Sequence, residues 1–476
     1  MNEQPISADL LYTYPSMDTH RLDAALEEML SRSNKKIVVL DDDPTGVQTV
    51  HHISVYTSWD KDALRSGFEE TNRMFFVLTN SRSLTKAQTM DTHREIVDNL
   101  IWASRQTGKD FLLISRSDST LRGHYPTETE VLRTSLESKT GMKFDGEIIF
   151  PFFKEGGRYT IDNVHYVKEG DVLIPAGMTE FANDKSFGYR ASHLGEWCEE
   201  KTEGAFRAED MIYISLDELR RMDFNAIEKK LSGATDFNKV IVNAVDDIDV
   251  KVFAVAFFRS IESGKSFIIR GAAAIAKVLG GVSDKTLLTK EELVSPDHTH
   301  GGIILVGSHV KKTTEQLDEL RNCASPIEFI EFNQHLVLEE GGLASEVDRV
   351  IHRVEKQIKS GKTVAVYTRR DRFDLDCDDK DAQLRISVKI SDAVTSIIAK
   401  LTVQPSFIVS KGGITSSDVG TKALKVRRAT VMGQVKPGVP VWMTDNESKF
   451  PNMPFVIFPG NVGDVSTLRE LIEILI

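Results

Sequence analysis

Residues 37–46 read IVVLDDDPTG, and this stretch decides how the rest of the chain is interpreted. Four apolar residues, three of them β-branched, run directly into three aspartates, a proline, a threonine and a glycine. The pattern predicts a buried strand that ends in an acidic loop. In an open α/β sheet, ligands bind beyond the carboxyl ends of the strands, where carboxylates can hold a metal ion or accept a proton. An acidic turn without a function has the same composition, so the rest of the chain has to decide between the two.

The composition describes a globular chain with more than one domain. The sequence has 476 residues, a formal net charge of -12, and 41% hydrophobic and 27% charged residues, which is too long for one ordinary domain. No apolar run approaches the roughly 18 residues of a membrane helix and the N-terminus lacks a signal-peptide pattern, so we expect a cytoplasmic protein without a membrane partner. The acidic balance argues against nucleic acid as a partner. The cysteines at Cys198, Cys323 and Cys377 fit neither a disulfide framework nor a paired metal-ligand spacing.

Strand-like and helix-like segments alternate along the chain. Short apolar runs such as 74–78 and 111–114 are followed by longer amphipathic stretches such as 91–105. This alternation is typical of a parallel sheet with helices on its faces, so the predicted fold class is α/β with two domains, each with a mostly parallel sheet flanked by helices. The turn-rich stretch VSPDHTHGG at 294–302 separates the two blocks. We therefore expect an N-terminal leader at 1–34, a first domain at 35–298 and a second domain at 299–476.

Three strand-like runs in the second block end in loops that contain glycine. The runs are 303–306, 407–409 and 455–458. The first loop carries Ser308, and the second reads KGGIT at 411–415. Glycines let backbone amides approach an anion closely, and the start of a helix adds the positive end of its dipole. The three loops together predict one convergent phosphate-binding pocket, although the Walker and G-x-G-x-x-G signatures are absent.

A second polar constellation follows a strand in the first block, where residues 115–124 read SRSDSTLRGH. Arginine side chains match carboxylates in bidentate fashion, while hydroxyl groups and Asp118 can hydrogen-bond a polyol. The GGR sequence at 156–158 adds another candidate anion clamp. These residues predict a site for a sugar acid. A structural network of ion pairs and caps between Arg116, Asp118 and Arg122 explains the same pattern.

In this order the motifs resemble the four-carbon acid sugar kinases, a family formerly of unknown function that phosphorylates tetronates such as threonate, erythronate and 3-oxo-tetronate. The matching motifs are DDPTG (42–46), DSTLRG (118–123), GR (157–158), GSHVKKTTEQL (307–317), KGGIT (411–415) and FPGNVG (458–463). The resemblance covers most of the chain, but not the leader. It implies an N-terminal domain for the sugar acid and a C-terminal domain for the nucleotide, in agreement with the boundary placed at the turn-rich stretch.

The resemblance also implies roles for individual residues. ATP would contact Ser308, Gly412, Gly413, Ile414, Thr415 and Gly460. The sugar acid would face Asp42, Asp43, Asp118, Arg122 and Arg158, and the polar constellation adds Arg116.

From these assignments we predict an ATP- and Mg²⁺-dependent kinase of carbohydrate catabolism. We hypothesise that Asp42 or Asp43 orients or deprotonates the terminal hydroxyl of the acid, and that Mg²⁺ bridges the phosphates. Arg122 or Arg158 would bind the substrate carboxylate. The motifs specify a class of substrate rather than one stereoisomer, assign no metal ligand, and leave open whether the chain forms a homo-oligomer.

Two other interpretations use the same residues. The D-x-D-x-T pattern that starts at Asp41 also opens haloacid-dehalogenase-like phosphatases, in which Asp41 would be the nucleophile. The later acidic pair of such an enzyme would come from Asp246, Asp247 and Asp249. That interpretation does not explain the three glycine-containing loops of the second block. The third alternative is a sensor that binds a sugar acid and a nucleotide but has no turnover.

Overall fold

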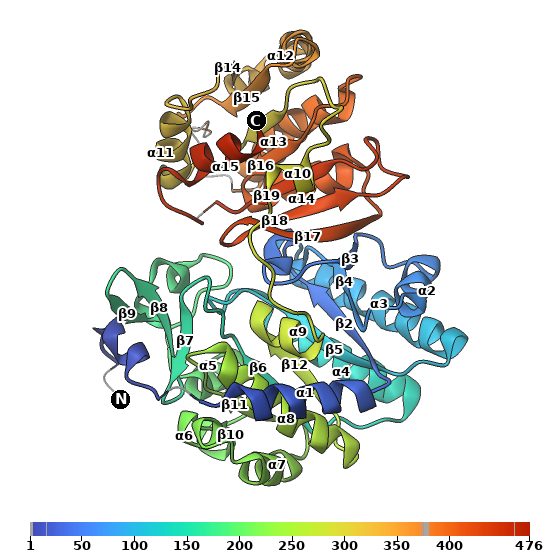
Figure 1. Ribbon diagram of the computed structural model, residues 1–476, viewed down its shortest axis with the longest axis vertical. Helices are drawn as coiled ribbons and strands as arrows, with labels where there is room; N and C mark the ends of the chain where they lie inside the picture. Colours follow the sequence, from blue (N-terminus) through green and yellow to red (C-terminus); the bar gives the residue numbers. More distant parts are fainter. Residues whose placement is uncertain (1–2, 16, 372, 374, 376–379, 461) are drawn as a thin grey trace. The chain divides into compact units, whose positions relative to one another are not determined.

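The computed structural model describes residues 3–15, 17–371, 373, 375, 380–460 and 462–476, and the chain divides into two compact units (Figure 1). Unit 1 spans Met1–Gly46 and Ser58–Ser283, and unit 2 spans Val47–Thr57 and Asp284–Ile476. The α/β class with two domains and mostly parallel sheets is confirmed. Contacts place residues 47–57 and 284–298 in unit 2, whereas the sequence assigned both segments to the first domain.

Unit 1 is built on a parallel sheet with the strand order β10-β11-β6-β12-β5-β2-β4. The strands are β2 (Lys36–Asp41), β4 (Met74–Leu78), β5 (Phe111–Arg116), β6 (Gly146–Phe150), β10 (Ile212–Ile214), β11 (Asn238–Val242) and β12 (Phe267–Gly271). Every residue of β2 and β4 is buried. Continuous apolar runs suit such strands because helices cover both of their faces.

Two groups of helices pack on this sheet. The first group is α2 (Lys61–Glu69), α3 (Lys86–Thr107) and α4 (Thr127–Thr140). The second group is α1 (Thr19–Arg32), α6 (Leu216–Arg220), α7 (Phe224–Ser232), α8 (Asp247–Glu262) and α9 (Ala273–Leu279). The crossovers β5–α4–β6 and β11–α8–β12 run in opposite directions along the sheet, so right-handed connections put the two groups on opposite faces. The remaining helix of this unit, α5 (Leu194–Lys201), packs against β11.

A smaller antiparallel sheet, which the sequence did not predict, completes unit 1. Its strand order is β1-β9-β8-β7, with bounds β1 (Ile6–Ser7), β7 (Arg158–Ile161), β8 (Val164–Glu169) and β9 (Val172–Pro175). The N-terminal segment is an integral part of unit 1, because β1 pairs with β9 and α1 lies alongside α8 (Figure 1).

Unit 2 contains a mixed sheet with the order β3-β17-β18-β19-β16-β13-β15-β14. Its strands are β3 (Ile53–Tyr56), β13 (Ile303–Val306), β14 (Ile327–Phe332), β15 (Thr363–Thr368), β16 (Ile408–Lys411), β17 (Arg428–Lys436), β18 (Val439–Thr444) and β19 (Pro454–Phe458). The segment from β19 to β14 is parallel, and β3, β17 and β18 extend it antiparallel. The helices are α10 (Lys290–Leu293), α11 (Lys311–Leu320), α12 (Gly342–Lys359), α13 (Lys380–Lys400), α14 (Gly413–Asp418) and α15 (Thr467–Leu475).

In both units the chain changes direction beside the first parallel strand. It passes from β2 to β4 on one side and then to β5 on the other, and in unit 2 β13 likewise lies between β15 and β16. Such switch points are where ligands bind at the carboxyl ends of open α/β sheets. The topology therefore draws attention to the loops after β2 and β5 in unit 1 and after β13 and β16 in unit 2.

Two sequence predictions can be compared directly with the described part of the chain. None of its helices combines the length and the apolar character that a membrane crossing requires. Cys198 is buried and Cys323 is half-buried, and both are free thiols, while Cys377 lies outside the described residues.

Candidate functional site

The acidic loop of unit 1 begins at Asp41, the last residue of β2. Asp41 and Asp42 are 1% and 2% exposed, whereas the Asp43 side chain is 19% exposed. A β-carbon on Gly46 would lie 2.0 Å from Oδ2 of Asp41, which explains the glycine of the DDPTG motif. The amide and the hydroxyl of Thr45 donate to Oδ1 of Asp43 at 2.8 and 2.5 Å. Asp43 is therefore the aspartate of this loop that is both fixed and accessible.

Arg82, which the sequence analysis missed, holds the carboxylates together. It lies in the short 3₁₀ turn Ser81–Ser83 after β4. Its Nε is 3.1 Å from Oδ2 of Asp42, its Nη2 is 2.8 Å from Oδ2 of Asp43, and its Nη1 is 4.0 Å from Oδ1 of Asp118. The signal was the polar sequence TNSRS at 79–83, directly after an apolar run, the same pattern that identified the acidic loop.

Arg116, a predicted substrate residue, ends β5 and is 4% exposed. Its Nη1 lies 3.4 Å from Oδ1 of Asp41 and 3.6 Å from Oδ1 of Asp42. These contacts fit the alternative of a structural ion-pair network, because the guanidinium neutralises the buried end of the acidic loop. A contact between Arg116 and the substrate stays a prediction.

The protonation of three adjacent carboxylates, Asp41, Asp42 and Asp43, depends on the balance between burial and the two guanidinium groups beside them. Burial raises the pKa of Asp41 to about 7 and that of Asp42 to about 8, against the opposing effect of the arginines. Burial is outweighed at Asp43, where Arg82 and the Thr45 hydrogen bonds hold the pKa of the carboxyl below its usual value. Asp43, the accessible aspartate of the loop, is thus ionised at neutral pH.

Asp118 and Arg122 form the next part of the site. Nε of Arg122 lies 2.7 Å from Oδ2 of Asp118, and its Nη1 lies 3.8 Å from Oδ2 of Asp184. Although burial opposes it, the nearby Arg122 and Arg82 hold the pKa of Asp118 well below its usual range. Arg122 is therefore already committed to carboxylates of the protein.

Arg158 differs from Arg122 in having no anionic partner. The two guanidinium groups lie over the same ring, Phe181, at 5.6 and 5.1 Å from its centre. Within the described residues the Arg158 side chain makes no ion pair, and its buried Nε has no hydrogen-bond partner. Burial lowers the pKa of Arg158, with Asp118 opposing. The Arg158 side chain is half-buried, and a partly buried cation without a counterion is costly, so Arg158 is the guanidinium that an anionic ligand would satisfy.

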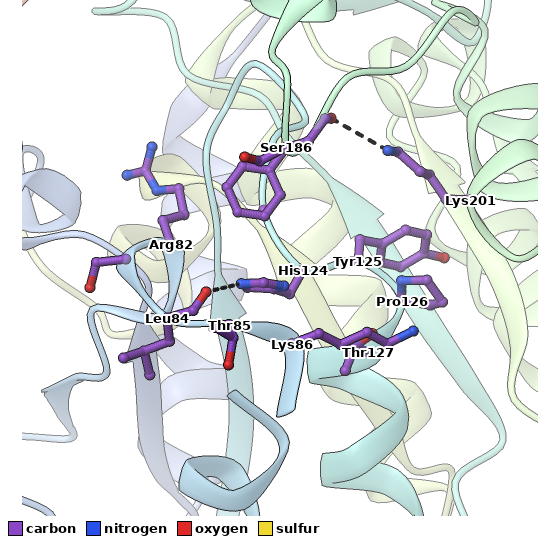
Figure 2. A pocket seen from close by; sticks show the side chains of 13 residues that line it. Arg82, Leu84, Thr85, Lys86, His124, Tyr125, Pro126, Thr127, Ser186 and Lys201 are labelled. Atoms are coloured by element: carbon purple, nitrogen blue, oxygen red, sulfur yellow. Dashed lines mark hydrogen bonds between the residues drawn. The ribbon is translucent and has the colours of Figure 1, made fainter. Parts of the chain in front are cut away.

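A pocket of about 560 Å³ has Arg82, the partner of Asp42 and Asp43, in its lining (Figure 2). It is lined by Arg82, Ser83, Leu84, Thr85, Lys86, Gly123, His124, Tyr125, Pro126, Thr127, Ser186, Phe187 and Lys201. His124 is fixed by a 3.0 Å contact with the carbonyl oxygen of Leu84, and Lys201 Nζ donates to the carbonyl oxygen of Phe187 at 3.4 Å (Figure 2). Among the lining residues described there are three cations and no carboxylate, and a space of this size holds a small acid.

In unit 2 the three glycine loops meet at Ser308. A β-carbon on Gly307 would lie 2.5 Å from Oγ1 of Thr415, one on Gly412 would lie 3.3 Å from Cβ of Ser308, and one on Gly460 would lie 3.8 Å from Oγ of Ser308. Gly412 also has φ +120, a conformation that favours glycine. The loops after β13, β16 and β19 thus converge as the sequence predicted.

The remaining predicted nucleotide residues lie at the start of α14. Gly413 and Ile414 are its first two residues, and Gly412 is its N-cap without a side chain to accept a hydrogen bond. Ile414 is 70% exposed, so its backbone rather than a packed side chain would contribute to a phosphate cradle.

Lys411, at the end of β16, fixes the third loop. Its Nζ donates to the carbonyl oxygens of Pro459 and Gly460 at 2.6 and 3.1 Å. The side chain is fully buried, and burial lowers its pKa to about 7, with Lys312 adding to the effect. Lys411 therefore positions Gly460 next to Ser308 rather than extending into the open.

The described residues contain no cluster of three or more His, Cys, Asp or Glu side chains arranged to hold a metal ion. The aspartates of the acidic loop and Asp118 instead lie within ion-pair distance of Arg82, Arg116 or Arg122. Mg²⁺ in nucleotide sites is usually held by phosphates with only one or two carboxylates, so the donor set is compatible with an ion that enters with a nucleotide.

The geometry argues against the phosphatase interpretation. Strand β11, which precedes Asp249, is four positions from β2 in the sheet, or roughly 19 Å from Asp41 at the usual strand spacing. Asp249 accepts the amides of Val245 and Asp246 at 2.9 Å each and pairs with Arg220 at 2.6 Å. It caps α8 and does not complete a metal site beside Asp41.

Comparisons with known proteins agree with this division of the chain. Residues 37–279 match a family model described as a sugar-binding N-terminal domain, and residues 303–468 match one described as a nucleotide-binding C-terminal domain. No functionally curated protein matches the chain.

Two solved structures have the same fold. A Haemophilus influenzae protein of the DUF1537 family is 16% identical, with a TM-score of 0.60 over 92% of this chain and 100% of that one. A Salmonella typhimurium LT2 protein provisionally named a tRNA synthase is 14% identical, with a TM-score of 0.66 over 93% and 100%. At such low identity these structures show the fold alone.

Proposed function

The chain belongs to the four-carbon acid sugar kinase family, and on that premise we propose that it transfers the γ-phosphoryl group of ATP to the terminal hydroxyl of a four-carbon sugar acid. The acid would be of the threonate, erythronate or 3-oxo-tetronate type. One unit has the sequence of a sugar-binding domain and the other that of a nucleotide-binding domain.

The observation that carries the proposal is the complementary chemistry of the two switch points. The site in unit 1 offers an ionised, accessible carboxylate at Asp43 and, at Arg158, a guanidinium that makes no ion pair within the described residues. The site in unit 2 offers converging glycine loops around Ser308. A polyol acid needs the first set of groups, and a polyphosphate needs the second.

Within this proposal each residue of unit 1 has a definite task. Asp43 accepts the hydrogen bond of the reacting hydroxyl and takes its proton as the new bond to phosphorus forms. Arg82 holds Asp43 in place and keeps it ionised, while Asp42 remains buried behind them. Arg158 binds the carboxylate of the acid. Phosphoryl transfer asks mainly for alignment and charge stabilisation, so turnover requires the hydroxyl and the γ-phosphate to meet in line.

The nucleotide phosphates would lie against the backbone of Ser308, Gly412 and Gly460, where the absence of side chains permits close approach. Mg²⁺, when bound with ATP, would neutralise charge on the phosphate oxygens.

The test is ADP formation by the purified chain with Mg-ATP and a panel of D- and L-threonate, D- and L-erythronate and 3-oxo-tetronates. Analogues that lack the terminal hydroxyl serve as controls, and the Asp43→Asn variant controls for a contaminating kinase. We expect ADP with one acid of the panel and none with its deoxy analogue. Binding of ATP and of a sugar acid without ADP formation would instead identify a sensor. Release of phosphate from phosphorylated acids would support the phosphatase interpretation.

A further inference from the structure

A fourth strand of unit 2 delivers a cation to the edge where the three glycine loops meet. Strand β15 neighbours β13 on the side opposite β16, and it is followed directly by Arg369 and Arg370. The order β19, β16, β13, β15 therefore places Gly460, Gly412, Ser308 and Arg370 at the carboxyl ends of four consecutive strands.

Arg370 is anchored to the Ser308 loop. Its Nη2 donates to the carbonyl oxygen of Ser308 at 2.7 Å, and its Nη2 and Nε donate to Oγ1 of Thr314 at 2.9 and 3.2 Å. Thr314 lies in the first turn of α11. The guanidinium is thus held in one orientation between the loop and the start of this helix.

The remaining nitrogen of the Arg370 guanidinium, Nη1, makes none of these hydrogen bonds. Nη1 of Arg370 is buried and has no hydrogen-bond partner, and within the described residues the side chain makes no ion pair. Burial lowers the pKa of Arg370, with Asp318 opposing. An anchored guanidinium with one buried, unsatisfied edge is built for an anion, because leaving it alone costs free energy.

The start of α11 adds to the same site. Helix α11 has ten residues, and its N-cap, Val310, offers no side-chain acceptor to the first amides. The positive end of a helix dipole favours an anion at this position. Together with the buried edge of Arg370, it describes a site for an oxyanion beside Ser308.

We infer that Arg370 is a phosphate-binding residue, with Nη1 contacting a phosphate oxygen of a nucleoside triphosphate that lies between the Ser308 and Gly412 loops. The inference rests on the proposed function in one respect, since it assumes that these loops hold the nucleotide. It adds a residue that lies outside all six motifs of the resemblance.

The experiment measures the Kd of ATP by calorimetry for the full chain and for Arg370→Gln, at several salt concentrations. We expect Arg370→Gln to raise the Kd by roughly 10- to 100-fold, the loss of a hydrogen bond to a charged group, and to make it less sensitive to salt, because one charge has left the contact. The KM for the sugar acid should stay within error.

Arg369→Gln is the matched control. The neighbouring Arg369 side chain pairs with Asp371 at 3.1 Å, so its loss should leave the Kd of ATP unchanged. In Arg370→Lys, which keeps the charge but not the planar fork of donors, the Kd of ATP should lie between those of Arg369→Gln and Arg370→Gln.

An unchanged Kd in Arg370→Gln would overturn the inference while leaving the kinase intact. A raised Kd with an undiminished salt dependence and a lowered melting temperature would also overturn it, because Arg370 would then only brace the Ser308 loop. Wild-type protein that binds ATP but phosphorylates no acid would overturn the proposed function and not this inference.

Discussion

Nη2 of Arg82 lies 2.8 Å from Oδ2 of Asp43, and this pair ties the loop after β4 to the loop after β2. The contact has two effects on one carboxylate. It fixes the position of Asp43, and it keeps Asp43 ionised while burial raises the pKa of its neighbour Asp42 to about 8.

Replacing Asp43 by asparagine should abolish most of the turnover. The amide keeps the size of the side chain but cannot take a proton, so kcat should fall by roughly 10²- to 10⁴-fold, with the Kd of ATP unchanged. Steady-state kinetics and calorimetry measure the two quantities. Asp62→Asn, at an exposed position of α2, is the control. An unchanged kcat would remove Asp43 from the mechanism, and a loss of ATP affinity would assign the loop to the other site.

Replacing Arg158 by glutamine should raise the KM for the sugar acid by roughly 10- to 100-fold, because the substrate carboxylate loses a charged hydrogen bond. The KM for ATP should not change. The wild type should also prefer the acid to its uncharged amide, and Arg158→Gln should not. Arg190→Gln, whose native side chain is 91% exposed, is the control. If the variant still prefers the acid, the carboxylate binds elsewhere, and the pocket with Lys86 and Lys201 becomes the next candidate.

Replacing Gly460 by alanine should weaken ATP binding without unfolding the protein. Among the described residues, chain neighbours aside, the new methyl group would meet Oγ of Ser308, at 3.8 Å, so the melting temperature should stay the same. A phosphate that lies against this backbone would be displaced, and the Kd should rise at least about tenfold, or 1.4 kcal/mol. Gly420→Ala, with its β-carbon 3.4 Å from Phe455, is the control in the same unit. Equal ATP affinity in the two variants would exclude Gly460 from the site.

Stability should depend on pH through Asp42. Its folded pKa of about 8 lies above the value of 3.8 for a free carboxyl, so the folded state binds the extra proton, and the stabilisation is lost as pH rises towards 8. The free energy of unfolding of the wild type should therefore fall, relative to that of Asp42→Asn, between about pH 4 and pH 8.

Urea unfolding at several pH values measures this difference. Asp43→Asn provides the opposite sign, because the pKa of Asp43 is lowered and the wild type should lose stability relative to this variant as pH falls. Parallel curves for the wild type and Asp42→Asn would show that Arg82 and Arg116 keep Asp42 ionised.

The positions of both sites could be predicted because their signals are local. An apolar run that stops in aspartates or glycines marks the end of a buried strand, and the ends of parallel strands lie at one edge of the sheet. Residues 303–306 and 455–458 were therefore sufficient to place Ser308 and Gly460, even though their loops are about 150 residues apart in sequence.

What escaped prediction depends on contacts between distant segments. Arg82 and Arg370 follow ordinary strands and belong to no recognised motif, and only the strand order shows that β4 adjoins β2 and β15 adjoins β13. The small sheet that carries Arg158 consists of strands of two to six residues. Such strands are too short to show a clear alternation of apolar and polar residues in the sequence. The commitment of Arg122 to Asp118 and Asp184 likewise depends on the fold.

Strand β3 belongs to unit 2 although unit 1 encloses it in the sequence. Tyr56 pairs with Arg428, about 370 residues later. During synthesis the strand therefore leaves the ribosome long before its partner exists, and the edge of unit 2 closes only when the chain is nearly complete. For the same reason no single cut yields two whole halves. A fragment that begins at residue 299 lacks β3, and one that ends at residue 298 carries β3 without β17, its antiparallel partner in unit 2.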